Sequence, residues 1–221
     1  MPPFDPAIPV TTPDGRTILL RPIGPQDRAQ LKRYAEGLSE RTRYLRFHST
    51  GTRLGAAELD YLSDVDQDRH VAWVSVESDG RVGHGLGRFV RLGGGDQAEV
   101  AITVRDAFQG RGLFKPLLAL LMVEARQRGV TTFRASVLDG NRVVRHLLED
   151  LGATLVPEQP GLMTATLGTD PGALPDTPTG RRVADYARHI ERARAAGGHW
   201  WGRAWWRLRR PFLASAEEVD G

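Results

Sequence analysis

Cysteine is absent from this sequence of 221 residues, and lysine is nearly absent. The lack of thiols excludes disulfides, cysteine nucleophiles and cysteine-ligated zinc or iron–sulfur centres. Only Lys32 and Lys115 of the thirty basic residues are lysines, so arginine supplies most of the positive charge. The formal net charge is only +3 and the basic residues are spread along the chain, so no nucleic-acid partner is expected.

Long apolar segments are also missing. The longest apolar run, residues 117–123, is far shorter than the roughly 20 residues of a membrane-spanning helix. The first ten residues, MPPFDPAIPV, have neither a basic segment nor a long apolar core, which argues against a signal peptide. We therefore expect a cytoplasmic protein. The length and the 40% hydrophobic content predict one globular domain of about 150–170 residues with a short appendage.

Hydrophobic periodicity and turn residues predict a mixed α/β fold, with a largely antiparallel sheet flanked by helices and at least one parallel strand pair. The connections within residues 71–104 are too short for crossovers, so the three strands expected there are antiparallel. The expected strands are 17–21, 71–77, 82–92, 98–104, 132–138, 153–156 and 162–167. The expected helices begin near Pro25, Ser39, Ala56, Leu113, Asn141 and Arg181.

The most informative motif is QGRGL, residues 109–113, between a predicted strand and a long predicted helix. A glycine-rich turn that leads into a helix presents unpaired backbone N–H groups, and with the helix dipole these favour a phosphate or pyrophosphate. Gly110 and Gly112 let the backbone approach such a ligand, and Arg111 adds charge. A plain strand-to-helix connection that uses glycine is the alternative. The Walker and dinucleotide-binding patterns are both absent.

From about residue 15 to 167, the order of elements resembles the GNAT superfamily of N-acetyltransferases. Gln109 and Gly112 match its acetyl-CoA motif, and Asn141 opens a helix that ends in Gly152-Ala153, as in its second motif. The segments LSERTRYLRF (38–47), DRHVA (68–72) and AEVA (98–101) are similar to bacterial protein-lysine acetyltransferases that act on acyl-CoA synthetases. The resemblance implies transfer of an acetyl or short acyl group from acyl-CoA to an amine, most simply a protein lysine.

The resemblance also implies a set of site residues. Glu99, on a strand face that it shares with the small residues Ala101 and Thr103, takes the general-base position. Backbone N–H groups near Ile102 and Val104 polarise the thioester carbonyl. Asn141 contacts the pantetheine arm, or else is a plain N-cap. The residues implied to hold the cofactor pyrophosphate are Gln109, Gly110, Arg111, Gly112, Leu113, Phe114 and Lys115.

Two positions depart from the family pattern. Phe114 stands where the acetyl-CoA motif has a last small residue, so either its side chain points into the core or cofactor binding is altered. Leu148 stands where many members have a tyrosine acid, although a thiolate leaves readily without one. A small-amine acetyltransferase and a non-catalytic acyl-CoA sensor therefore stay open as alternatives. The six histidines do not cluster at ligand spacings, so no metal is implied, and His70 and His84 are interpreted as structural.

The C-terminal part has a different composition. We expect a GNAT domain over residues 1–168, a Pro/Gly linker over 169–180, and a helix with a basic tail over 181–221. Residues 197–213 hold four of the five tryptophans and four arginines. Such a segment suits docking onto the domain, an anionic membrane surface, or a groove on a partner.

Overall fold

The computed structural model describes residues 7–40, 42, 55–77 and 83–196. An eight-stranded sheet forms its centre, in the order β1-β2-β3-β4-β5-β6-β8-β7. All neighbouring strands are antiparallel except β5 and β6, which are parallel. The strands are β1 (Ile8–Thr11), β2 (Thr17–Pro22), β3 (His70–Glu77), β4 (Gly83–Arg91), β5 (Gln97–Val104), β6 (Thr132–Leu138), β7 (Thr154–Gln159) and β8 (Leu162–Gly168).

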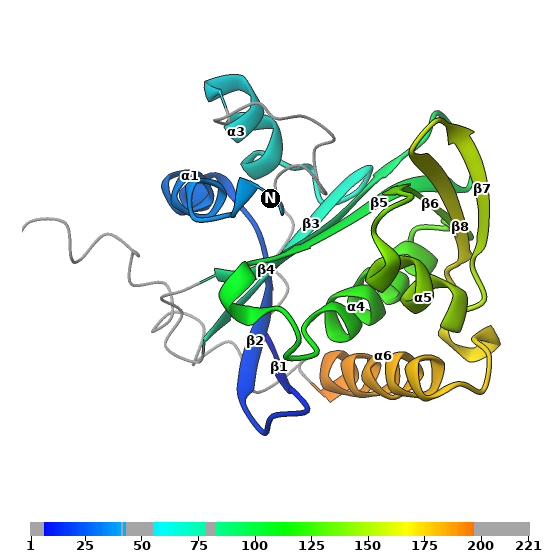
Figure 1. The fold of residues 1–221 in the computed structure, drawn as a ribbon. Coiled ribbons are helices and arrows are strands. Elements are labelled where there is room, and N and C mark those ends of the chain that lie inside the picture. Colours follow the sequence, from blue (N-terminus) through cyan, green and yellow to red (C-terminus); the bar gives the residue numbers. More distant parts are fainter. Residues whose placement is uncertain (1–6, 41, 43–54, 78–82, 197–221) are drawn as a thin grey trace, which may run out of the picture.

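Helices cover the sheet on two sides (Figure 1). One face carries α1 (Arg28–Glu36) and α3 (Ala56–Ser63), whose leucines pack with Ala72 of β3 and Leu86 of β4. The opposite face carries α4 (Phe114–Gln127), α5 (Arg142–Asp150) and α6 (Pro178–Ala196). Short 3-10 turns occur at Pro25–Asp27, Asp106–Phe108 and Pro171–Ala173.

Helix α4 is the centre of the main core. Its residues from Pro116 to Ala125 are all buried, which explains why the run of leucines in this segment is continuous rather than one-sided. Phe89 and Phe133 lie beneath it in the sheet, with ring centroids 5.7 Å apart. Helix α6 packs along α4 and contributes Val183, Ala187 and Ile190 to the same core.

The mixed α/β fold with a largely antiparallel sheet is confirmed, and the predicted strands and helices within the described residues are present. Strand β1 was not predicted. Ser39 accepts a hydrogen bond from the Thr42 N–H at 3.1 Å, which is an N-cap contact. The rest of the helix expected after Ser39, with Tyr44, Leu45 and Phe47, lies outside the described residues, as does the tail from residue 197.

The segment expected to be a linker lies against the rest of the molecule. Thr169 Oγ1 donates to the Val130 carbonyl at 2.7 Å, and Thr177 Oγ1 donates to the Asp150 carbonyl at 2.7 Å. Helix α6 begins at Pro178, three residues earlier than predicted. The side chain of Arg194 forms an ion pair with Glu124 of α4, which is only 1% exposed, and its guanidinium lies 5.3 Å from the centre of the Trp73 ring. The domain limits given above remain a prediction.

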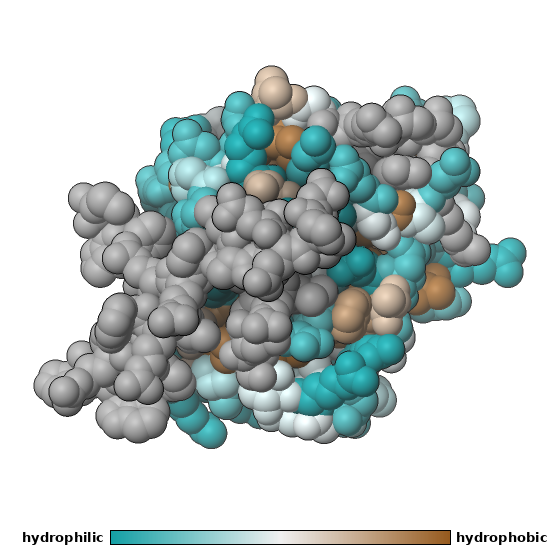
Figure 2. Space-filling view, turned by 90° about the vertical axis from the view of Figure 1, so that its left-hand side faces the viewer, coloured by the Kyte–Doolittle hydropathy of each residue, from teal (hydrophilic) through white to brown (hydrophobic). Residues whose placement is uncertain are grey.

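None of the helices in the described part of the chain is long and apolar enough to cross a membrane. On the side shown in Figure 2, the coloured surface is mostly hydrophilic, and its hydrophobic residues form small separate areas. Isolated apolar residues of this kind are normal on protein surfaces.

Candidate acyl-CoA site and acceptor face

The two parallel strands separate soon after they meet. Pairing between β5 and β6 covers only Gln97 with Thr132, Ala98 with Phe133 and Glu99 with Arg134. Strand β5 continues to Val104 and β6 continues to Leu138, but no further pairs join them. The two strands therefore diverge next to the turn that leads into α4, and we call this interruption of the ladder between them the opening.

Backbone groups of β5 point into this opening. Gln97 accepts a hydrogen bond from the Leu92 N–H, and Arg105 donates one to the His84 carbonyl, both on the β4 side. Backbone groups alternate in direction along a strand, so those of Ile102 and Val104 point toward β6. Because β6 has already separated, the N–H groups of Ile102 and Val104 have no strand partner there.

The turn from residue 109 to α4 has free donors. Among the described residues, none accepts a hydrogen bond from the backbone N–H groups of residues 110–115. Gly110 has φ +75°, and a Cβ built there would meet nothing within 4 Å. Gly112 has φ +81°, but its Cβ would lie 2.8 Å from the Pro13 ring. Gly110 thus leaves space for a ligand, whereas Gly112 allows close packing between this turn and the loop after β1.

The side chains of the predicted pyrophosphate residues divide into two groups. Leu113 is buried in the main core, and Phe114 is half-buried and packs against that core. Arg111 and Lys115 are partly exposed, and the Arg111 guanidinium lies 5.2 Å from the centre of the Phe108 ring. The packing of Phe114 agrees with the first of the two alternatives, in which its side chain points into the core.

The Gln109 side chain holds the turn in place. Its Nε2 donates to Thr42 Oγ1 at 3.0 Å and to the Val104 carbonyl at 3.2 Å. Close by, the Asp106 carboxylate accepts hydrogen bonds from the Ser39 N–H, the Ser39 hydroxyl and the Thr42 hydroxyl. Burial raises the pKa of the Asp106 carboxyl, but these hydrogen bonds outweigh it and hold the pKa below its usual value. Sequence reasoning missed this network because its partners are more than 60 residues apart.

Glu99 lies on the sheet face opposite α4. Its neighbour Ala98 is buried under α4 in the main core, and Glu99, the next residue along the strand, is exposed on the other face. Val90 of β4 and Arg134 of β6 are its direct neighbours across the sheet. Helix α1 is fixed near the same strand, because the Tyr34 hydroxyl donates to the Thr103 carbonyl at 2.9 Å.

Asn141 forms the N-cap of α5. Its Oδ1 accepts a long hydrogen bond, 3.4 Å, from the Val144 N–H. This supports the capping interpretation and leaves the contact with pantetheine untested. Leu148 is 6% exposed and packs in a small core with Val137 and Ala165, so the side chain at this position is apolar and directed inward.

Two buried histidines flank the site. Burial, assisted by Arg88 and opposed by Asp66, lowers the pKa of His70 to about 4. Burial also lowers the pKa of His84, although Glu77, 3.6 Å from its Nε2, acts in the opposite direction. The His84 ring lies 3.9 Å from the Phe108 ring, beneath the turn. One ring nitrogen of each histidine, Nε2 of His70 and Nδ1 of His84, is buried without a hydrogen bond to a described residue, so the structural role expected for the two histidines stays a prediction.

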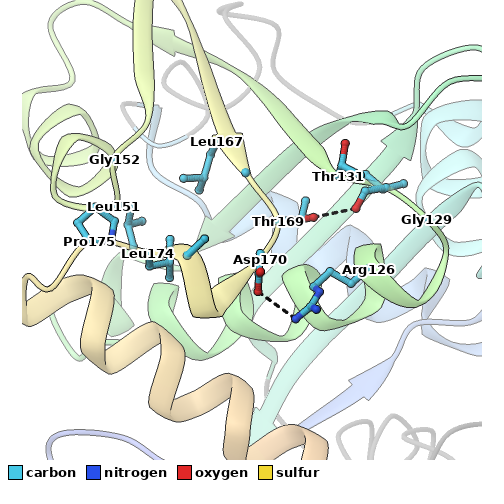
Figure 3. A pocket seen from close by; sticks show the side chains of 13 residues that line it. Arg126, Gly129, Thr131, Leu151, Gly152, Leu167, Thr169, Asp170, Leu174 and Pro175 are labelled. Atoms are coloured by element: carbon cyan, nitrogen blue, oxygen red, sulfur yellow. Dashed lines mark hydrogen bonds and ion pairs between the residues drawn. The ribbon is translucent and has the colours of Figure 1, made fainter.

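No group of three or more potential metal ligands occurs within the described ranges. A separate cavity of about 390 Å³ lies where α4 and α5 end (Figure 3). The ion pair between Arg126 and Asp170, 3.0 Å long, stands at its edge. This cavity is at the opposite end of α4 from the glycine turn, so it is not part of the candidate site.

A family model and several known proteins match a large part of this chain. The family model of the acetyltransferase (GNAT) domain matches residues 17–154. Acetyltransferase Pat of Mycolicibacterium smegmatis is 37% identical over 167 residues, 74% of this chain and 49% of that protein. This chain therefore spans about half the length of that relative. Acetyltransferase PA5475 of Pseudomonas aeruginosa is 33% identical over 141 residues, 63% of this chain and 76% of that protein.

The crystal structure of the GNAT domain of S. lividans PAT matches with a TM-score of 0.69 and 30% identity, and the match covers 73% of this chain and 96% of that domain. The range matched by the family model, residues 17–154, includes β5, β6, the glycine turn and α4, which form the candidate site. The family model alone covers more than half of the chain. The protein therefore belongs to the GNAT acetyltransferase family, as its sequence predicted.

Proposed function

We propose that this protein transfers an acetyl group from acetyl-CoA to the ε-amine of a lysine in another protein. The observation that carries the proposal is the combination of an opening between β5 and β6 with a row of backbone N–H groups, residues 110–115, from which no described residue accepts a hydrogen bond. Such a row at the start of a helix favours the binding of a pyrophosphate. An opening beside it accepts the extended pantetheine arm of acetyl-CoA.

The residues present fit acetyl-CoA. The N–H groups of residues 110–115 would hold the pyrophosphate, with Arg111 and Lys115 adding positive charge. The edge of β5 would pair with the pantetheine arm, and the N–H groups of Ile102 or Val104 would donate to the thioester carbonyl. When bound, acetyl-CoA supplies an activated acyl group whose carbonyl carbon accepts an amine.

Glu99 is the proposed general base. A lysine ammonium has a pKa of about 10.4, so only about one in 2,500 is a free amine at pH 7, a cost of about 4–5 kcal/mol. Glu99 takes a proton from the lysine nitrogen, which then bonds to the carbonyl carbon as the carbon–sulfur bond breaks. The sulfur leaves as a thiolate and takes a proton from solvent. Since Leu148 offers no acid, this last proton does not come from that position.

A protein is the proposed acceptor because Glu99 lies on an exposed sheet face rather than in a closed pocket. The similarity to Acetyltransferase Pat and to the PAT domain supports a lysine acceptor. The family branch that the sequence resembles makes acyl-CoA synthetases the first proteins to try. A cytoplasmic location, and a role of residues 197–213 in docking or membrane contact, are further proposals from the sequence alone.

The test combines calorimetric titration with acetyl-CoA and a thiol-release assay on acyl-CoA synthetases, for the wild type and Glu99→Gln. We expect Glu99→Gln to bind acetyl-CoA like the wild type but to lose about 10²–10⁴-fold in kcat, the usual contribution of a general base. Glu191→Gln, which removes an exposed carboxylate on α6, is the matched control. Binding without turnover by the wild type would favour an acyl-CoA sensor, and turnover only with small amines would overturn the protein acceptor.

A further inference from the structure

The face that carries Glu99 continues beyond it over β6 and β8, where none of the described helices covers it. Along the sheet, Glu99 pairs with Arg134, and Arg134 pairs with Thr166 of β8. Paired residues of neighbouring strands project to the same face. The preceding row, Ala98 and Phe133 with Leu167, is buried in the main core under α4, so the row with Glu99 and Arg134 faces the other way.

Among the described helices, α1 and α3 cover this face only over β3 and β4 (Figure 1). Over β6, β8 and β7 it forms a groove of about 460 Å³. Polar groups come from Gln97, Arg134, Glu158, Thr164 and Thr166, and apolar ones from Val156 and Pro157. The groove is open and has both polar and apolar walls, which suits an extended peptide more than a small apolar ligand.

Arg134 is the positive charge of this groove. It is exposed, and no described residue accepts a hydrogen bond from its guanidinium or forms an ion pair with it. The nearby Glu158 carboxylate instead accepts a hydrogen bond from Thr164 Oγ1 at 2.7 Å. A guanidinium has five donors in a planar arrangement that matches a carboxylate, so a free one in a polar groove is suited to bind a carboxylate.

The spacing relates this charge to the proposed base. Neighbouring strands lie about 4.8 Å apart, and an extended peptide advances about 3.3 Å per residue. Since alternate side chains of an extended peptide project to the same side, a carboxylate two residues from an acceptor lysine would reach Arg134 while the lysine nitrogen is at Glu99. Arg134 also repels an incoming ammonium, and a neighbouring carboxylate on the acceptor offsets that repulsion.

We propose that Arg134 is a specificity-determining residue that selects acceptor lysines with an aspartate or glutamate two positions away. The proposal rests on the proposed function, with Glu99 at the acceptor nitrogen. The occupant of the groove is then the acidic stretch of the acceptor polypeptide, and the charge complementarity between this stretch and Arg134 fixes which lysine is presented.

The experiment measures kcat/KM on three peptides that differ only at the position two residues after the lysine, which is Glu, Gln or Lys. We expect the wild type to prefer the Glu peptide to the Gln peptide by about fivefold, the effect of one partly exposed ion pair. Arg134→Ala should lose this preference, and Arg134→Glu should reverse it in favour of the Lys peptide. Arg192→Glu, with the same charge change on α6, should keep the wild-type order.

Each preference is the ratio of two kcat/KM values measured on the same preparation. Partial unfolding of a variant lowers both values equally and leaves their ratio unchanged. Equal kcat/KM of the wild type on all three peptides would overturn the role of Arg134 and leave the proposed function standing. Retention of the Glu preference in Arg134→Glu would overturn it too. Failure of the wild type to acetylate any peptide, with acetyl-CoA bound, would overturn the proposed function and this inference together.

Discussion

The carboxylate of Asp106 accepts hydrogen bonds from both the backbone N–H and the hydroxyl of Ser39, which is 67 residues earlier in the chain. Ser39 follows α1 on one face of the sheet, whereas Asp106 begins the turn that leads to α4 on the other. Thr42 joins the same carboxylate at 2.7 Å and also accepts from Gln109. The segment after α1 is thereby tied to the turn that presents the free N–H groups.

Replacing Asp106 by alanine should loosen this tie. Loss of these partly exposed hydrogen bonds is expected to lower the free energy of unfolding by about 1 kcal/mol. The affinity for acetyl-CoA should fall as well, because the turn is less well fixed. Urea unfolding and calorimetric titration measure the two effects, and Asp185→Ala, on the exposed side of α6, is the control. Unchanged affinity in Asp106→Ala would show that the turn is fixed by other contacts.

The two glycines of the turn should respond differently to alanine. A left-handed backbone costs a non-glycine residue about 1–2 kcal/mol, and we expect that loss of stability for Gly110→Ala. Gly112→Ala should lose more, because its Cβ would also lie 2.8 Å from the Pro13 ring. In a Pro13→Ala background the extra loss should largely disappear. Thermal or urea unfolding of the four variants measures this coupling, and an unchanged penalty in that background would contradict the contact.

His70 predicts a pH dependence of stability. Its pKa is about 4 in the folded protein because of burial, with Arg88 acting in the same direction. An unfolded histidine titrates near 6.5, so between these values the unfolded chain binds more protons and stability rises with pH. The stability that depends on His70 being neutral is fully present above pH 6.5, and it is lost as the pH falls toward 4. His70→Gln should flatten the stability curve between pH 5 and 6.5, whereas His146→Gln, on an exposed side chain, should not.

The ion pair between Arg194 and Glu124 should be important for the docking of α6. Glu124 is 1% exposed and has Arg128 as a second partner at 2.5 Å. Removing Arg194 leaves a buried carboxylate with only one of its two partners, so Arg194→Met is expected to cost about 3 kcal/mol of stability. The double variant with Glu124→Gln should recover part of this loss. Arg192→Met, on an exposed position of α6, is the matched control.

The features that sequence could predict are those with a local signal. Alternation along β3 and β5, the turn glycines at 110 and 112, and the apolar run of α4 all lie within short segments. Strand β1 has only four residues, one of them Pro9, and depends on pairing with β2 and on contacts from α6, such as Tyr186 Oη to the Thr11 carbonyl. Local composition carries no such information.

The remaining features of the fold and the site depend on contacts between distant segments. The proline-rich composition of residues 169–180 predicts a linker, yet Thr169 and Thr177 bond to groups 39 and 27 residues away. In α6, the spacing of Val183, Ala187 and Ile190 was a visible sign of a buried face. The adjacency of Glu99 and Arg134 required the register of the only parallel pair among the described strands, which spacing along the chain does not fix.

The most direct test of the central claim is calorimetric titration of the wild type with acetyl-CoA and with S-acetylpantetheine, which lacks the pyrophosphate and the 3′-phosphoadenosine joined to it. If the N–H groups of residues 110–115 bind the pyrophosphate, acetyl-CoA should bind at least about 100-fold more tightly, since two charge-assisted hydrogen bonds of about 1.5 kcal/mol each would suffice. Equal affinities for the two compounds, or no binding of either, would contradict the assignment of this turn as the pyrophosphate site.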